Sequence, residues 1–147
     1  MTQTAAPTAA ELCHCSAVRQ AGRWMTQLYD SHLAPCGLRS SQFAVLARLK
    51  ELGSASVAEL AEALVMDRTT VTRNVTPLQR DGLVQVDMHV SDGRRKAIVL
   101  TAQGRERLAA ARPHWRRAQA EFEAHFGAQK AAQMRTLLRA VPAPRAG

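Results

Sequence analysis

The fold is decided by residues 66–82, MDRTTVTRNVTPLQRDG, which predict a helix with two unlike sides. The apolar side chains recur at helical spacing and form one stripe: Val71, Val75 and Leu78. Asp67 precedes the stripe as a candidate N-cap, and Gly82 ends the helix. The helix is costly, because β-branched residues are poor helix formers and an interior proline such as Pro77 costs about 3 kcal/mol. These residues are therefore expected to have a role other than stabilising the helix.

The charge of the chain indicates a polyanionic partner. Its 147 residues hold 20 Lys and Arg against 12 Asp and Glu, a net charge of +8 at pH 7. Such a balance is typical of proteins that bind nucleic acid. No apolar run reaches the roughly 18 residues of a membrane span. The odd number of cysteines fits a reducing compartment, so we expect a cytoplasmic protein. The length of the chain fits a single domain over residues 1–147.

Two shorter helices are expected before residue 66. They are SQFAVLARLKEL at residues 41–52 and VAELAEAL at residues 57–64. Ser40 or Ser41 can cap the first of these helices, and Gly53 ends it. Ser56 and Glu59 form a capping box at the start of the second. The second of these helices and the helix after Asp67 are separated by a short turn, so the two form a helix-turn-helix.

The residues after Gly82 predict a β-hairpin. LVQVDM at residues 83–88 alternates, RKAIVL is β-branched and apolar, and the loop HVSDGRR between them holds the turn signal Asp92-Gly93. A helix-turn-helix followed by a basic-tipped hairpin is a winged helix-turn-helix. We therefore predict a mainly α fold with a small β-hairpin wing, in which about residues 40–101 form the DNA-binding unit.

This fold explains the costly helix, because its second helix enters the major groove of DNA. The side opposite the apolar stripe carries Thr69, Thr70, Arg73, Thr76, Pro77 and Arg80. We predict DNA contacts from Thr69, Thr70, Thr72 and Arg73. Threonine allows close approach to DNA, and Arg73 can bind guanine through two hydrogen bonds. A merely solvated polar face is the alternative.

The residues VAELAEALVMDRTTVTRNVTPLQRDGLV and DGRRKAIVLTAQG resemble the MarR family of bacterial transcriptional regulators. The wing signature of that family, D-x-R followed by L-T-x-x-G, appears as Asp92, Arg94, Leu100, Thr101 and Gly104. The resemblance covers about residues 12–141. It implies that Arg94 reaches into the minor groove while Asp92 supports it, and we expect Arg95 and Lys96 to meet phosphates. The alternative is that Arg94 is a surface arginine without a role in DNA binding.

The resemblance also implies a homodimer whose N- and C-terminal helices interlock, here about residues 11–36 and 102–141. Large apolar residues outside the DNA-binding unit support this independently: Trp24, Tyr29, Trp115, Phe122 and Phe126. Two-fold symmetry would place the recognition helices about 34–36 Å apart on a palindromic operator. Because occupying a promoter ordinarily blocks polymerase, repression is expected rather than activation.

The first helix holds candidate sensor residues. Its sequence resembles the organic-hydroperoxide-sensing branch of the MarR family, with Cys15 at the reactive-cysteine position and Tyr29 matching a tyrosine that contacts the thiol. Arg19 and Ser40 stand where that branch has further tyrosines. A redox role for Cys15, with Cys36 as a resolving thiol, competes with the preferred interpretation of Cys15 as a buried structural thiol.

A metal site at Cys13 and Cys15 is not expected, since two residues two positions apart on a helix point roughly 200° apart. Most MarR-like proteins respond instead to small aromatic or carboxylate ligands. The candidate pocket residues, which also suit a dimer seam, are Arg19, Arg23, Trp24 and Tyr29.

We therefore expect a homodimeric repressor that a small aromatic or carboxylate ligand releases from a palindromic operator in double-stranded DNA. The alternatives are an oxidant-sensing repressor that acts through Cys15 and a constitutive architectural DNA-binding protein. No cofactor or membrane partner is expected. An enzyme is not expected either, because no paired carboxylates, nucleophile–base pair or phosphate-binding glycine loop stands out.

Overall fold

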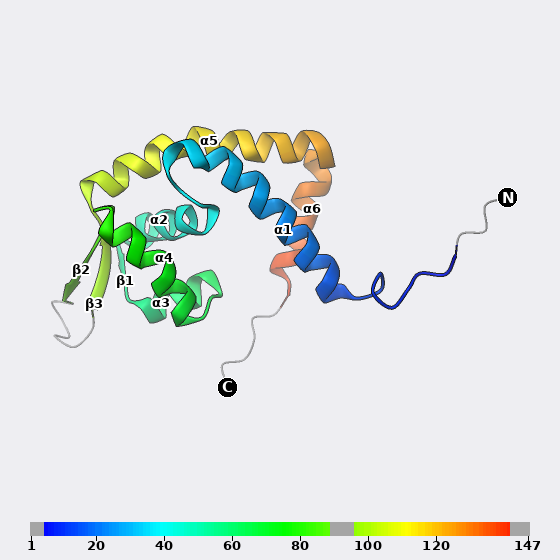
Figure 1. Ribbon diagram of the computed structural model, residues 1–147, viewed down its shortest axis with the longest axis horizontal. Coiled ribbons are helices and arrows are strands. Elements are labelled where there is room, and N and C mark those ends of the chain that lie inside the picture. Colours follow the sequence, from blue (N-terminus) through cyan, green and yellow to red (C-terminus); the bar gives the residue numbers. More distant parts are fainter. Residues whose placement is uncertain (1–4, 89–95, 142–147) are drawn as a thin grey trace.

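The computed structural model describes residues 5–88 and 96–141, and one long helix connects its two halves (Figure 1). This helix, α5 (Ala102–Phe126), runs across the molecule with α1 (His14–Leu33) packed beside it. At its far end α6 (Ala128–Arg139) turns away from it. The remaining helices lie under the other half of α5: α2 (Ser40–Leu52), α3 (Val57–Leu64) and α4 (Arg68–Arg80), with a short 3-10 turn, η1 (Ala34–Cys36), before them. No described helix is long and apolar enough to span a membrane.

A small antiparallel sheet packs against α2 and α4. Its strands are β1 (Ser54–Ala55), β2 (Val84–Met88) and β3 (Lys96–Leu100), in the order β1-β3-β2. The pairing of Val84 with Leu100 and of Met88 with Lys96 confirms the predicted hairpin. The sequence did not predict β1, because a strand of two residues is too short to show an alternating pattern.

The apolar stripe of α4 is confirmed as part of the core. Val71 is 0% exposed, Val75 6% and Leu78 1%. They join a cluster with α2 side chains such as Leu46 and Leu49. Burying a large aliphatic side chain stabilises the fold by about 1.5–3 kcal/mol. The core therefore holds α4 in place despite the interior Pro77, through which the helix continues.

Most of the predicted helix caps are confirmed. Asp67 caps α4, Ser56 and Glu59 form the capping box of α3, and Gly53 ends α2. The expectation that Ser40 or Ser41 caps α2 is wrong. Arg39 holds the N-cap position, and its backbone N–H donates to Gln42 Oε1 at 3.0 Å. Both serines are inside the helix, where they serve other contacts.

The start of α1 also differs from the expectation. The helix begins at His14, and Cys13 is its N-cap, with its Sγ accepting from the Ser16 N–H at 3.4 Å. The helix therefore starts about three residues later than the expected bound near residue 11. Because Cys13 lies outside the helix, the argument that Cys13 and Cys15 must diverge by roughly 200° does not apply.

The turn between α3 and α4 depends on an unusual backbone conformation. Val65 has φ 53° and ψ 49°, in the left-handed region that a β-branched residue rarely adopts. The Met66 N–H donates to the Ala61 carbonyl oxygen at 2.9 Å and closes the end of α3. The conformation costs about 1–2 kcal/mol, which the packing of the two helices must offset.

The junction between wing and α5 explains the L-T-x-x-G part of the wing signature. Thr101 caps α5: its Oγ1 accepts from the Gly104 N–H at 3.0 Å and donates to the Gly82 carbonyl oxygen at 2.6 Å. The Thr101 N–H donates to the Leu83 carbonyl oxygen at 3.1 Å. A Cβ on Gly104 would overlap that same oxygen. One threonine and one glycine thus bind the end of β3 and the start of α5 to the end of α4.

Candidate nucleic-acid interface

The side of α4 that faces away from the core presents polar and basic side chains to solvent. The exposed polar side chains of α4 are Arg68, Thr69, Thr72, Arg73, Thr76, Gln79 and Arg80. Of the side predicted to face away from the core, the structure exposes Thr69, Arg73, Thr76 and Arg80. Thr72, predicted to contact DNA, is exposed beside that side. Arg68 was not predicted, because helical periodicity puts it near the apolar stripe, and it is exposed as the first residue of α4.

Thr70 and Pro77 depart from the expectation, since both are half-buried rather than exposed. The Thr70 N–H donates to Asp67 Oδ1 at 2.7 Å, and its hydroxyl donates to Oδ2 at 3.0 Å. These two hydrogen bonds hold the pKa of the Asp67 carboxyl below its usual range, with a smaller contribution from the charge of Arg73. Thr70 therefore uses its hydroxyl proton to fix the first turn of α4, and only its oxygen lone pairs stay available to other groups.

The Asp67 cap also gives the start of α4 a pH dependence. Because the folded carboxyl has a lowered pKa, its stabilising contribution is present above the ordinary Asp pKa and is lost as the pH falls through the folded value. The cap is therefore complete at neutral pH.

The arginines of α4 are available for a ligand. In residues 5–88 and 96–141, Arg68 and Arg73 form no ion pair, whereas Arg80 Nε lies 4.0 Å from Asp81 Oδ1. Exposed guanidinium groups without a carboxylate partner suit phosphate oxygens or the O6 and N7 atoms of guanine. The beginning of α4 is thus the more basic and less neutralised part of its open side.

Asn74 is a functional candidate that the sequence analysis missed. It follows Arg73, is half-buried, and accepts a 2.8 Å hydrogen bond from the Ser41 hydroxyl of α2. A helical projection places it between the apolar stripe and the open side. The position alone could have singled it out, because a polar residue beside a core stripe needs a partner.

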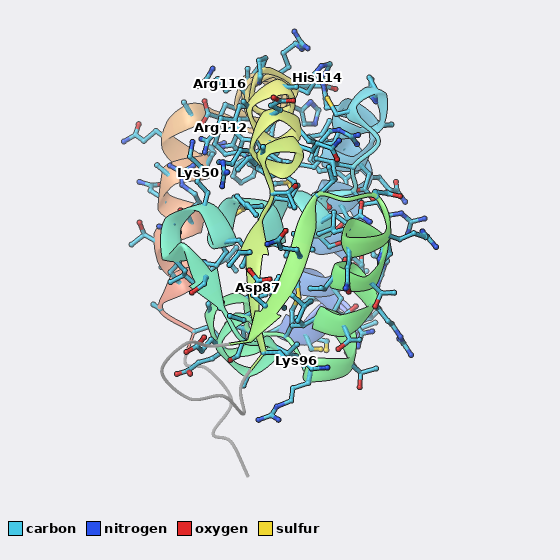
Figure 2. All side chains as sticks on the ribbon, turned by 90° about the vertical axis from the view of Figure 1, so that its left-hand side faces the viewer. Lys50, Asp87, Lys96, Arg112, His114 and Arg116 are labelled. Atoms are coloured by element: carbon cyan, nitrogen blue, oxygen red, sulfur yellow. The ribbon has the colours of Figure 1, made fainter. Side chains whose placement is uncertain are left out.

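The wing residues Asp92, Arg94 and Arg95 lie outside the described residues. Lys96, the first residue of β3, is exposed, and Figure 2 shows it projecting from the lower end of the sheet. In the same view Arg112 and Arg116 lie along α5 at the opposite end of the molecule. Arg112 and Arg116 therefore lie away from the end of the molecule that Lys96 marks.

Comparisons with known proteins agree with this geometry. The sequence model of the MarR family matches residues 38–96. The M. tuberculosis transcriptional regulator MosR, whose crystal structure in complex with DNA is known, is 40% identical and superposes with a TM-score of 0.77, covering 91% of this chain and 99% of MosR. The chain belongs to the MarR family.

Two curated transcriptional regulators extend the comparison. The uncharacterised regulator YwoH of Bacillus subtilis is 32% identical over 90 residues, which span 61% of this chain and 65% of YwoH. The transcriptional regulator HosA of Escherichia coli is 29% identical over 108 residues, 74% of this chain and 75% of HosA. These relatives are transcriptional regulators rather than enzymes. This MarR-family chain is accordingly a DNA-binding transcriptional regulator with a winged helix-turn-helix.

The candidate pocket residues of this MarR-family chain do not share one site. Trp24 borders a hollow of about 280 Å³ between α1, α5 and α6, whose other lining residues include Phe122, His125, Phe126 and Met134. Arg19 and Arg23 line a separate open groove of about 510 Å³ on α1.

Tyr29 is engaged elsewhere, since its hydroxyl donates a hydrogen bond to Gln119 Oε1 of α5. Burial raises the pKa of Tyr29, and the nearby Glu123 carboxylate adds to the shift. Tyr29 thus fastens α1 to α5 rather than facing the same hollow as Trp24.

The preferred interpretation of Cys15 as a buried thiol is wrong for the single chain. Cys13 and Cys15 are both exposed, and Cys36 is half-buried at the other end of α1. All residues from Cys15 to Leu33 are helical, so about 27 Å of helix separates Cys15 from the turn that holds Cys36. Folding of one chain therefore does not bring Cys36 to Cys15. Among the described residues, no three His, Cys, Asp or Glu side chains are grouped to hold a metal ion.

Proposed function

We propose that the protein is a homodimeric repressor that inserts α4 into the major groove of a palindromic operator and is released by a small aromatic or carboxylate molecule. The observation that carries the proposal is the open side of α4, where exposed Thr69 and Arg73 lie opposite the buried stripe and exposed Thr72 lies beside them. Such a helix is fixed from behind by the core. It presents its N-terminal half to base edges.

Exposed apolar side chains on α1 and α6 and around the end of α5 support the dimer. The largest of them are Val18, Trp24, Phe126, Leu137 and Leu138, which are 41–71% exposed. An apolar surface of this kind is typical of a protein interface. We propose that residues 11–36 and 102–141 dimerise while residues 40–101 bind DNA. A two-fold axis between them would match a palindromic operator.

The hollow beside Trp24 supports an aromatic effector. Its walls are the rings of Trp24, Phe122 and Phe126 together with His125, and the Trp24 and Phe122 ring centroids lie 5.9 Å apart. A volume of about 280 Å³ suits a single-ring compound, since apolar cavities near 150 Å³ already bind benzene. His125 is a polar group that could bind a carboxylate there.

The function is tested by selecting an operator from a randomised DNA pool and then measuring its affinity by fluorescence anisotropy. We expect a tight complex with two protein chains per duplex, which one member of a panel of aromatic acids weakens. Chelator should have no effect. Equal affinity for the selected duplex and a shuffled one would instead identify an architectural DNA-binding protein.

For the wing we predict that Arg94→Ala weakens operator binding and lowers the slope of log affinity against log salt by about one unit, because one cation–phosphate or minor-groove contact is lost. The slope comes from anisotropy titrations over a salt series. Arg116→Ala on α5 is the matched control and should keep the wild-type slope. An Arg94→Ala variant with full affinity and an unchanged slope would remove the wing from the interface.

A thiol switch is the second candidate, favoured by the exposure of Cys13 and Cys15 at the start of α1. A hydroperoxide would oxidise the Cys15 thiolate to sulfenic acid and be reduced to the alcohol. The polar product would disturb an apolar dimer seam.

If the Cys15 thiol is the sensor, mild hydroperoxide should release the operator from the wild type and not from Cys15→Ser. Reductant should restore binding. Cys36→Ser is the control and should still respond, since Cys36 lies at the far end of α1. Operator binding that survives hydroperoxide in the wild type would leave the aromatic effector as the proposal.

A further inference from the structure

Polar groups link three helices from α1 to α4. Asp30 Oδ1, near the end of α1, accepts a hydrogen bond of 2.6 Å from the backbone N–H of Ser40. The next residue of α2, Ser41, donates from its hydroxyl to Asn74 Oδ1 at 2.8 Å. Asn74 Nδ2 donates in turn to the Thr70 carbonyl oxygen at 3.0 Å. These bonds connect the end of α1, the first turn of α2 and the DNA-facing half of α4.

The charge of Asp30 favours its hydrogen bond to the Ser40 N–H. Asp30 is half-buried, and its carboxylate lies at the N-terminus of α2, the positive end of the helix dipole. A hydrogen bond from a backbone N–H to a carboxylate is roughly twice as strong as a neutral one. The start of α2 is therefore fastened to α1 at the point where Ser41 reaches toward α4.

The link at α4 fixes a direction as well as a distance. Asn74 lies between the buried stripe and exposed Arg73, where an apolar side chain would simply extend the stripe onto α2. Apolar packing tolerates small rotations of a helix about its axis, whereas hydrogen bonds weaken steeply when their angles change. The Asn74 amide is bonded through its nitrogen to the backbone of α4 and through its oxygen to Ser41 of α2. It therefore restrains the rotation of α4 about its own axis, which determines the direction in which Arg73 projects.

We propose that Asn74 is a positioning residue for DNA recognition: together with Ser41 it sets the orientation of α4 on α2, and Asp30 ties that setting to α1. The inference rests on the proposed function, because it requires α4 to be the helix that reads the operator. Asn74 acts through Arg73 and touches no base itself. Its amide oxygen and one of its two amide N–H donors are already bonded within the chain.

The test compares Ser41→Ala, Asn74→Ala and the double variant on two DNA duplexes. One is the duplex that the wild-type protein selects from a randomised pool, and the other is a shuffled duplex of the same base composition. Each single variant should bind the selected duplex roughly tenfold more weakly and the shuffled duplex as the wild type does. The double variant should lose little more than either single one, since both changes remove the same contact. Ser41→Thr keeps the hydroxyl and should retain wild-type binding.

Asp30→Ala should lower the same discrimination and should be non-additive with Asn74→Ala. Losses that simply add, or that are equal on both duplexes, would overturn the positioning role. A reduced salt slope for Ser41→Ala would overturn it too, because it would show that Ser41 contacts a phosphate directly. If Asn74→Ala does not unfold cooperatively, Ser41→Ala decides the question, since it leaves α4 intact.

Arg73→Ala separates this inference from the proposed function. If Arg73→Ala leaves discrimination between the duplexes unchanged, α4 does not read the operator and the proposed function fails. If Arg73→Ala loses discrimination while Ser41→Ala and Asn74→Ala bind like the wild type, only the positioning role is wrong.

Discussion

Gly104→Ala should lower the free energy of unfolding by about 3 kcal/mol, at the upper end of what overpacking a buried site costs. Gly104 is buried in the first turn of α5, and its missing side chain leaves room for the carbonyl oxygen of Leu83. That oxygen is backbone and accepts a hydrogen bond from the Thr101 N–H, so it cannot move aside without breaking the junction. A methyl group would force β2 and α5 apart.

The same change should also weaken DNA binding by more than the loss of stability explains. Thr101 Oγ1 holds the Gly82 carbonyl oxygen at the end of α4 and the Gly104 N–H at once. Displacing α5 therefore displaces the end of the recognition helix and the base of the wing together. Binding measured well below the melting temperature, where the variant remains folded, reports this effect.

Gly22→Ala is the matched control, because Gly22 is also a helical glycine but a Cβ added there would meet no neighbouring element within 4 Å. That substitution should raise the free energy of unfolding by roughly 0.5–1 kcal/mol, since alanine loses less backbone entropy in a helix. Urea denaturation of both variants gives the comparison. A Gly104→Ala protein as stable as the wild type would show that the junction can open.

The parts of the fold that the sequence predicts are those that depend on neighbours along the chain. The stripe of α4 follows from a period of 3.6 residues, and the caps at Asp67 and Ser56 follow from one side chain bonding a backbone N–H a few residues on. The hairpin follows from a turn signal between two β-prone runs. Each of these needs no knowledge of the tertiary structure.

The features that the sequence does not predict depend on contacts between distant residues. Strand β1 exists because Ser54 and Ala55 pair with β3, more than 40 residues later. Ser41 looks like a cap in sequence but bonds Asn74 of α4, 33 residues away. In each case a long-range partner takes a group whose local pattern suggests another role.

In the candidate interface, too, local patterns predict some residues and long-range contacts determine others. Helical periodicity places Thr69 and Arg73 on the open side of α4, and both are exposed in the structure. Thr70 looks equivalent to Thr69 in sequence, yet the carboxylate of Asp67 engages its hydroxyl. For the sensor residues, periodicity could not tell that Trp24 packs with Phe122 while Tyr29 bonds Gln119, because both depend on how α1 crosses α5.

Arg73→Ala should cost about 1–3 kcal/mol in affinity for the selected operator, a loss of roughly fivefold to 150-fold, and much less on shuffled DNA. Arg73 is exposed in the second turn of α4, on a helix whose back is buried and whose first turn is fixed by Asp67. A guanidinium held this way can bind guanine O6 and N7 with two parallel hydrogen bonds. Truncation to alanine removes both, while helix propensity favours the variant slightly.

Two other arginines serve as controls. Arg80→Ala removes a cation from the last turn of α4, beside Asp81, where phosphate rather than base contact is expected, so both duplexes should weaken by a similar factor. Arg116→Ala, on α5 at the opposite end of the molecule from Lys96, should change neither affinity.

The ratio of the two affinities decides what Arg73 does, because contacts to phosphate contribute equally on any sequence whereas contacts to bases do not. A fall on the selected duplex alone identifies Arg73 as a base-reading residue. Equal falls on both duplexes would make it a phosphate contact and would move base recognition to Thr69 and Thr72. Selecting a new operator with the Arg73→Ala variant then gives an independent check: the base pair that Arg73 reads should be the one position at which the preference of the variant becomes relaxed.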